Sequence, residues 1–213
     1  MEYALVGLDR EGTIIKNVDY LGRNDDWREQ LEFLPGVIGA IRRLNDNQKI
    51  KITVCANEPR IALGFFGSQR AEEINSEINE RLLEKDARID NWQYCPYVDI
   101  PYAQKHGISN TNKWIMNEAD GRKPKIGMLW EAANELGLNW QELYHKKGVY
   151  FVGDELSDVQ TGLNANGKGI FVGGQDELEK VKVFHEKTDF TQRLCFAKNL
   201  TDAVALILRD ITS

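Results

Sequence analysis

The sequence predicts an α/β fold, a three-layer domain in which helices cover both faces of a parallel β-sheet of about five strands. Short apolar runs recur along the chain, and segments with helical spacing or many charges separate them. The runs are continuously apolar, as expected for strands that are buried on both faces. A length of 213 residues with 42% apolar residues suits one buried core and is short for two, so we expect a single domain, 1–213.

Five apolar runs have the length of strands. They are YALVGL at 3–8, IKITVC at 50–55, WQYC at 92–95, GVYFVG at 148–153 and GIFVG at 169–173.

Four amphipathic segments predict helices between and after these runs. Pro35 suits the first turn of one helix, Gly137 suits the end of another, and Thr201 is a candidate N-cap for the last. In chain order, the predicted helices cover 37–44, 68–86, 125–138 and 201–211.

The composition argues against several classes of partner. The net charge of −6 and the pI near 5.2 provide no whole-surface attraction to nucleic acid or to anionic lipid. No apolar stretch approaches the roughly 20 residues of a membrane-spanning helix, and the N-terminus lacks the pattern of a signal peptide. We therefore expect a soluble, cytoplasmic protein with no membrane as partner, and the charge balance disfavours nucleic acid as one. The oligomeric state stays open.

Candidate functional residues follow the predicted strands, because ligands of open α/β sheets bind outside the carboxyl ends of the strands. Carboxylates from two strands and a lysine from a third segment should meet at this edge. The residues collected by this rule are Asp9, Arg10, Glu11, Gly12, Thr13, Ala56, Asn57, Glu58, Arg122, Lys123, Lys125, Asp154, Glu155 and Asp158.

These residue types fit phosphoryl-transfer chemistry. Two aspartates can hold a Mg²⁺ ion that keeps some waters and accepts a phosphate oxygen. A lysine beside them can neutralise the phosphoryl oxygens while one aspartate attacks phosphorus. An aspartyl-phosphate formed in this way divides hydrolysis into two steps.

Three segments in order along the chain resemble motifs I, III and IV of the haloacid dehalogenase (HAD)-like phosphatases: LDREGT (8–13), RKPKIGM (122–128) and VGDELSD (152–158). The similarity extends from residue 5 to about 172, and NEPRIALGFF resembles the segment around motif II. It is closest to the branch that holds D-glycero-D-manno-heptose 1,7-bisphosphate phosphatase and histidinol phosphatase. The resemblance implies a HAD-like, Rossmann-like fold with a minimal cap.

The resemblance also implies roles for individual residues. Asp9 would be the nucleophile and a Mg²⁺ ligand, and Asp154 would be the second side-chain ligand. Glu11 would occupy the general acid/base position, and its backbone carbonyl would bind the metal. Lys123 would stabilise the phosphoryl group, oriented by Asp158. Arg122, Asn57 and Thr13 are the candidate substrate-binding residues.

Two positions depart from the family pattern. The family has aspartate at the position of Glu11, and the extra methylene moves the carboxylate by about a bond length, although a proton donor must lie within ~3 Å of its acceptor. At Ala56 the usual threonine or serine hydroxyl is missing, and the loss of such a donor can lower the rate by roughly 10²–10³. Asn57 could replace that donor in part through its amide or backbone N–H. We expect slow turnover or an altered substrate pose.

Two segments are long enough to cover the site, namely a flap at 14–34 and a loop at 96–121. With so small a cap, substrate choice should come from these segments. Zinc, which the heptose branch often binds in a Cys/His loop, is not expected, since Cys95 and His106 cannot supply four ligands. The aromatic residues of the loop region are candidates for packing or for stacking on a ring of the substrate: Tyr94, Tyr97, Tyr102 and Trp114.

The leading functional hypothesis is a Mg²⁺-dependent phosphatase that hydrolyses a phosphomonoester of a sugar or similar small metabolite through Asp9. One alternative is a polynucleotide 3′-phosphatase, because KPKIGMLW at 123–130 also resembles motif III of that group. Another is a catalytically impaired binding or regulatory protein, for which Glu11 and Ala56 are the evidence.

Overall fold

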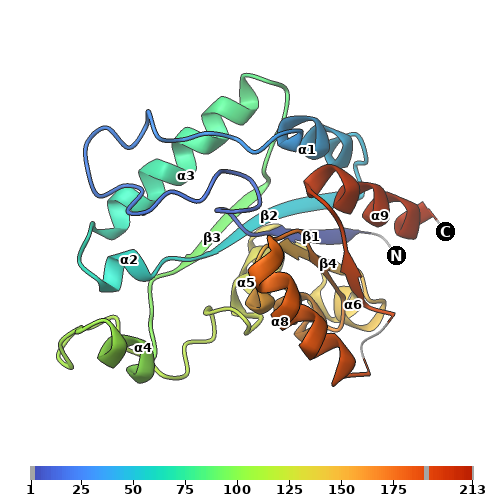
Figure 1. The fold of residues 1–213 in the computed structure, drawn as a ribbon. Coiled ribbons are helices and arrows are strands. Elements are labelled where there is room, and N and C mark those ends of the chain that lie inside the picture. The colour runs from blue at the N-terminus through green and yellow to red at the C-terminus, as the bar shows by residue number, and fades with distance from the viewer. Residues whose placement is uncertain (1–2, 190–191, 213) are drawn as a thin grey trace.

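The computed structural model describes residues 3–189 and 192–212, so residues 1–2, 190–191 and 213 of the predicted domain lie outside the description. Within these residues, six strands form one sheet in the order β3-β2-β1-β4-β5-β6, and each neighbouring pair is parallel (Figure 1). The strands are β1 (Ala4–Leu8), β2 (Ile50–Asn57), β3 (Asn91–Cys95), β4 (Val149–Gly153), β5 (Lys168–Phe171) and β6 (Leu194–Phe196). The predicted fold class is confirmed, with one more strand at the β5 edge.

Strand β1 lies at the centre of the sheet, and its five residues are buried. Val6 is in register with Ile52 of β2 on one side and with Tyr150 of β4 on the other. Its side chains alternate between two cores, since Val6 belongs to one apolar cluster and Leu5 to a second. A continuous apolar run is therefore required here, because burial of each such side chain contributes about 1.5–3 kcal/mol.

Helices cover the two faces of the sheet (Figure 1). On one face, α1 (Val37–Asn45), α3 (Ser68–Leu83) and α9 (Leu200–Thr212) contribute to the larger core. On the other face lie α5 (Gly127–Glu135), α6 (Trp140–His145), α7 (Leu156–Asn164) and α8 (Gln175–Glu186). The short helices α2 (Pro59–Ala62) and α4 (Ile100–Lys105) follow β2 and β3, beyond the carboxyl edge of the sheet.

The predicted helices match α1, α3, α5 and α9 within a few residues. Gly137 follows the end of α5 with a φ of 66°, as predicted. The predicted cap of the last helix was wrong, because the Asn199 side chain, and not Thr201, accepts the backbone N–H of Asp202, at 3.0 Å. Pro35 also lies outside its helix, one residue before the N-cap Gly36.

The two predicted lid segments, the flap at 14–34 and the loop at 96–121, each contain buried apolar side chains. In 14–34, Trp27 and Leu21 are fully buried against the core. In 96–121, Val98 and Ala103 form a small separate cluster with Ala62 of α2. None of the helices in 3–189 and 192–212 is long and apolar enough to cross a membrane.

Candidate active site

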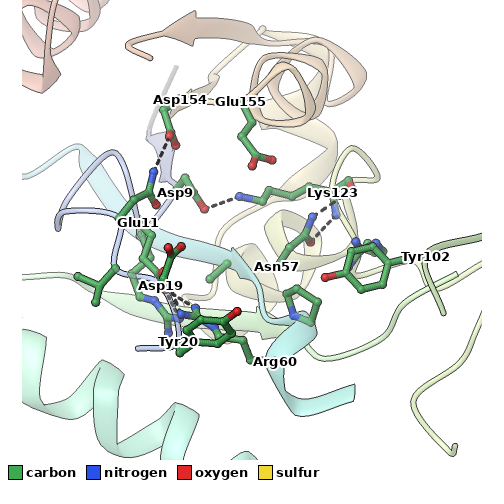
Figure 2. Close-up of a pocket in the computed structure, with 16 residues that line it drawn as sticks. Asp9, Glu11, Asp19, Tyr20, Asn57, Arg60, Tyr102, Lys123, Asp154 and Glu155 are labelled. Atoms are coloured by element: carbon green, nitrogen blue, oxygen red, sulfur yellow. Dashed lines mark hydrogen bonds and ion pairs between the residues drawn. The ribbon is translucent and has the colours of Figure 1, made fainter. Parts of the chain in front are cut away.

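A pocket of about 600 Å³ lies at the carboxyl edge of the sheet, where β1, β2 and β4 end (Figure 2). Both lid segments contribute to its wall, as do the loops that carry the three motifs. The lining residues are Asp9, Arg10, Glu11, Asn17, Val18, Asp19, Tyr20, Ala56, Asn57, Pro59, Arg60, Tyr102, Arg122, Lys123, Asp154 and Glu155.

Lys123 joins two aspartates at the base of this pocket. Its Nζ lies 2.5 Å from Oδ1 of Asp9 and 2.6 Å from Oδ1 of Asp158, and Figure 2 shows the side chain directed at Asp9. Burial opposes the charge of the ammonium, but Asp158 and Asp9 outweigh it and raise the pKa of Lys123. The lysine is therefore a permanent cation beside the Asp9 carboxylate.

Asp158 is held by the start of α7. Its Oδ2 accepts the backbone N–H of Glu155 at 2.9 Å, and together with the Glu155 side chain this forms a capping box. A Cβ at Gly153 would lie 2.2 Å from the Asp158 carboxyl, so this close approach requires glycine. Asp158 thus reaches Lys123 from a fixed position.

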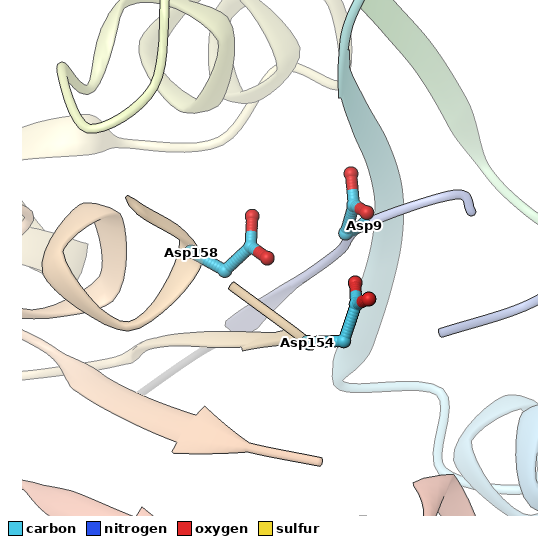
Figure 3. Close-up of side chains that lie close together, drawn as sticks. All are labelled: Asp9, Asp154 and Asp158. Carbon is cyan, nitrogen blue, oxygen red and sulfur yellow. The ribbon is translucent and has the colours of Figure 1, made fainter. Parts of the chain in front are cut away.

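Oxygen atoms of Asp9, Asp154 and Asp158 lie within 4.8 Å of one another (Figure 3). Oδ1 of Asp154 is buried and has no hydrogen-bond partner in the part of the chain that the structure describes. A Cβ at Gly12, whose φ is +80°, would lie 2.0 Å from Oδ2 of Asp154, so glycine at 12 lets motif I approach motif IV. An unpartnered buried carboxylate oxygen beside Asp9 suits a hard cation such as Mg²⁺.

The repulsion between neighbouring carboxylates affects the pKa of Asp154. Burial, together with the charges of Asp9 and Glu155, raises the pKa of Asp154 to about 7. The carboxyl is therefore protonated more readily in the folded than in the unfolded chain. Between pH ~4 and ~7, stability attributable to this group falls as pH rises, because the folded state then binds more protons.

We expect Asp154→Asn to stabilise the metal-free protein at pH 8, by roughly 2 kcal/mol after allowance for solvent screening. The gain should disappear as the pH falls toward 5, where the wild-type carboxyl is protonated. Thermal unfolding at both pH values measures it, and each kcal/mol corresponds to about 2–4 °C in Tm for a chain of this length.

Added Mg²⁺ provides the matched comparison for this variant. The ion should raise the Tm of the wild type at pH 8 and leave that of Asp154→Asn unchanged. A variant that is less stable than the wild type without metal at pH 8 would show that Asp154 is not a strained carboxylate.

Glu11 forms ion pairs with two arginines and lies outside the three-aspartate cluster. Arg60 donates to both of its carboxylate oxygens, and Arg10 donates to Oε1 at 2.9 Å. Burial alone would raise the pKa of Glu11, but Arg10 and Arg60 lower it. The Glu11 carboxylate, to which the resemblance assigns acid/base chemistry, is thus held at the pocket wall by the two arginines.

Asn57 clamps the backbone of Lys123. Its Oδ1 accepts the Lys123 N–H at 3.0 Å, and its Nδ2 donates to the Lys123 carbonyl at 3.3 Å. The amide that was predicted to replace a motif II hydroxyl is therefore engaged in placing the lysine. Ala56 lines the pocket beside it.

Arg122 lies at the pocket wall formed by the 96–121 segment. Its Nη1 donates to the Tyr97 carbonyl at 2.9 Å, and its guanidinium lies 5.5 Å from the centroid of the Tyr102 ring. Tyr97 and Trp114 pack edge to face with their centroids 5.5 Å apart. Of the four predicted aromatic candidates, Tyr102 lines the pocket.

Thr13 lies away from the lining of this pocket. It is 2% exposed, and its hydroxyl has no hydrogen-bond partner among residues 3–189 and 192–212. Its role in substrate binding stays a prediction. Conversely, Arg60 was not among the sequence candidates, although it lies two residues after Glu58, the last residue collected behind β2.

Two curated relatives are bacterial D-glycero-β-D-manno-heptose-1,7-bisphosphate 7-phosphatases. That of Escherichia coli strain K12 is 30% identical over 159 residues, which are 75% of this chain and 73% of the relative. That of Haemophilus influenzae is 29% identical over 161 residues, 76% of each protein. A family model described as HAD-hydrolase-like matches residues 121–203.

Solved structures share the fold. A D,D-heptose 1,7-bisphosphate phosphatase from B. bronchiseptica, complexed with magnesium and phosphate, gives a TM-score of 0.69 at 20% identity, over 97% of this chain and 99% of that chain. A protein from Mesorhizobium loti described as HAD-like gives 0.65 at 28% identity, over 82% of this chain and 74% of that chain. On this sequence identity and this fold, the chain belongs to the HAD-like hydrolases and is related to the heptose bisphosphate phosphatases among them.

Proposed function

We propose that this protein is a Mg²⁺-dependent phosphatase that hydrolyses a phosphomonoester through an aspartyl-phosphate on Asp9. The observation that carries the proposal is the setting of Asp9, which contacts the buried Lys123 ammonium and lies beside the unpartnered oxygen of Asp154. A carboxylate between a fixed cation and an unpartnered carboxylate oxygen that can bind a metal is suited to attack an anionic phosphoryl group.

In the first step, an oxygen of Asp9 forms a bond to phosphorus while the bond from phosphorus to the leaving oxygen breaks. Lys123 neutralises phosphoryl charge throughout, and the leaving oxygen takes a proton from water. In the second step, water attacks phosphorus, the bond to Asp9 breaks, and the attacking water gives its proton to the Glu11 carboxylate, the proposed base. A bound Mg²⁺, held by Asp9, Asp154 and the Glu11 carbonyl, would reduce repulsion between the nucleophile and the phosphoryl oxygens.

The pocket supports a small, polar substrate such as a sugar phosphate. Its volume of about 600 Å³ is within the range for small-molecule sites. Arg122 supplies a second cation on the side of the 96–121 segment, and Asp19 and Tyr20 face the pocket from the flap (Figure 2). Thr13, Asn57 and Arg122 remain the proposed substrate-binding residues, with Asn57 acting through the placement of Lys123.

The experiment is a measurement of phosphate release from sugar phosphates, nucleotides, p-nitrophenyl phosphate and an oligonucleotide with a 3′-phosphate, with Mg²⁺ and with chelator. We expect metal-dependent release from sugar phosphates or similar metabolites. A strong preference for the oligonucleotide would favour the 3′-phosphatase alternative. Silence across the whole panel would contradict the proposal and favour a binding or regulatory protein.

A further inference from the structure

Four charged residues at the pocket wall form a closed group that we call the charge ring: Arg10, Glu11, Glu58 and Arg60. Their charges alternate and sum to zero, and their contacts connect the loop after β1 with the start of α2. Arg60 binds Glu58 through Nε at 2.6 Å and through Nη2 at 3.2 Å, and Arg10 also pairs with Glu58. Arg60 and Arg10 both bind Glu11, which closes the ring.

The ring is rigid because its inner members are buried. Side-chain exposure is 0% for Glu58 and 1% for Arg10, and Nη1 of Arg10 is fixed by Oδ1 of Asn75 on α3 at 2.8 Å. Arg60 and Glu11, with side-chain exposures of 13% and 18%, form the more exposed side of the ring, at the pocket. Glu11 is therefore anchored from behind while it stays accessible from the pocket.

The contact between Arg60 and Glu11 depends on side-chain length. Nη1 of Arg60 donates to Oε2 at 3.0 Å, while Nη2 donates to Oε1, so the planar guanidinium binds both oxygens. Aspartate at 11 would withdraw its carboxylate by one methylene and could not keep both contacts from the same backbone. The longer side chain at 11 and the arginine at 60 are thus matched to each other.

We propose that Arg60 is a positioning residue, which holds the Glu11 carboxylate in place so that glutamate, and not aspartate, is the working residue at position 11. This inference deepens the proposed function and rests on it. Glutamate has one more rotatable bond than aspartate, so a carboxylate that must meet a proton within ~3 Å needs such a fixed partner. Arg60, which is itself held by Glu58, is that fixed partner.

The test compares the wild type with Arg60→Ala, Glu11→Asp and the double variant, using Mg²⁺ and the best substrate of the phosphate-release panel. We expect Arg60→Ala to lower kcat by about 10- to 100-fold, within the contribution of a positioned acid or base, with KM nearly unchanged. Arg60→Lys should not rescue kcat, because an ammonium cannot bind both oxygens in the same plane.

Non-additivity distinguishes positioning from mere structural support. Glu11→Asp should lower kcat in the wild type, and it should lower kcat much less once Arg60 is alanine, because the contact is then already lost. Arg88→Ala, which removes an exposed arginine that pairs with Asp90, is the matched control and should leave kcat unchanged. Unchanged or increased kcat in Arg60→Ala, or losses that simply multiply in the double variant, would overturn the inference.

A second readout does not need turnover. In protein with ¹³C-labelled glutamate, the Glu11 carboxyl resonance, assigned by its disappearance in Glu11→Gln, should shift in Arg60→Gln and stay in place in Arg88→Ala. No shift in Arg60→Gln would overturn the inference by itself. A shift in a protein that releases no phosphate would instead refute the proposed function while the contact between Arg60 and Glu11 stands.

Discussion

Asp9→Asn is expected to lower phosphate release by at least about 10³-fold, the scale on which loss of a nucleophile acts. An amide oxygen carries no charge with which to attack phosphorus, although it can still accept a hydrogen bond from Lys123. The measurement is kcat with Mg²⁺ at saturating substrate. The variant should fold, because removing a charge 4.8 Å or less from Asp154 and Asp158 relieves repulsion among the three carboxylates.

The stability of Asp9→Asn serves as the control for its activity. Its Tm without metal should equal or exceed that of the wild type, so that lost activity cannot be attributed to unfolding. If the variant retained a tenth of the wild-type kcat, Asp9 would not be the nucleophile.

Lys123→Met is expected to affect both activity and stability. It leaves the partly buried Asp9 and the buried Asp158 without their shared cation, which should lower the free energy of unfolding by about 3–5 kcal/mol. It also removes the group that neutralises the phosphoryl oxygens, so kcat should fall by roughly 10²–10³. Chemical denaturation and steady-state kinetics measure the two effects separately.

The double variant Lys123→Met with Asp158→Asn separates these effects. It removes one of the unpaired charges together with the lysine, so we expect it to regain much of the stability and none of the activity. Recovery of activity together with stability would mean that Lys123 only supports the fold.

The sheet could be predicted because its strands carry their own signal. The run at Ala4–Leu8 is apolar throughout since both of its faces are covered, and that pattern is visible without the fold. The edge strand Leu194–Phe196 was missed because it has three residues, of which Phe196 is exposed, and so it resembles a loop. Local spacing also gave the approximate limits of α1, α3, α5 and α9.

The main residues of the pocket could be predicted because parallel strands end at one edge. Asp9 and Asp154 each follow a strand and Asn57 is the last residue of one, so their meeting follows from topology. Their partners could not be predicted in the same way. The clamp of Asn57 on Lys123 joins residues 66 positions apart, and the pairing of Arg60 with Glu11 joins residues 49 positions apart. Such contacts depend on how the loops pack against one another, and the spacing of residues along the sequence does not reveal that packing.

The most direct test for an aspartyl-phosphate on Asp9 is mass spectrometry of peptides from protein quenched in acid during turnover with Mg²⁺. We expect the peptide containing Asp9 to carry the added mass of one phosphoryl group, alkaline hydroxylamine to remove that mass, and Asp9→Asn to lack it. Phosphate release without a phosphorylated Asp9 peptide, in samples quenched within a single turnover, would contradict the central claim that Asp9 forms a covalent intermediate.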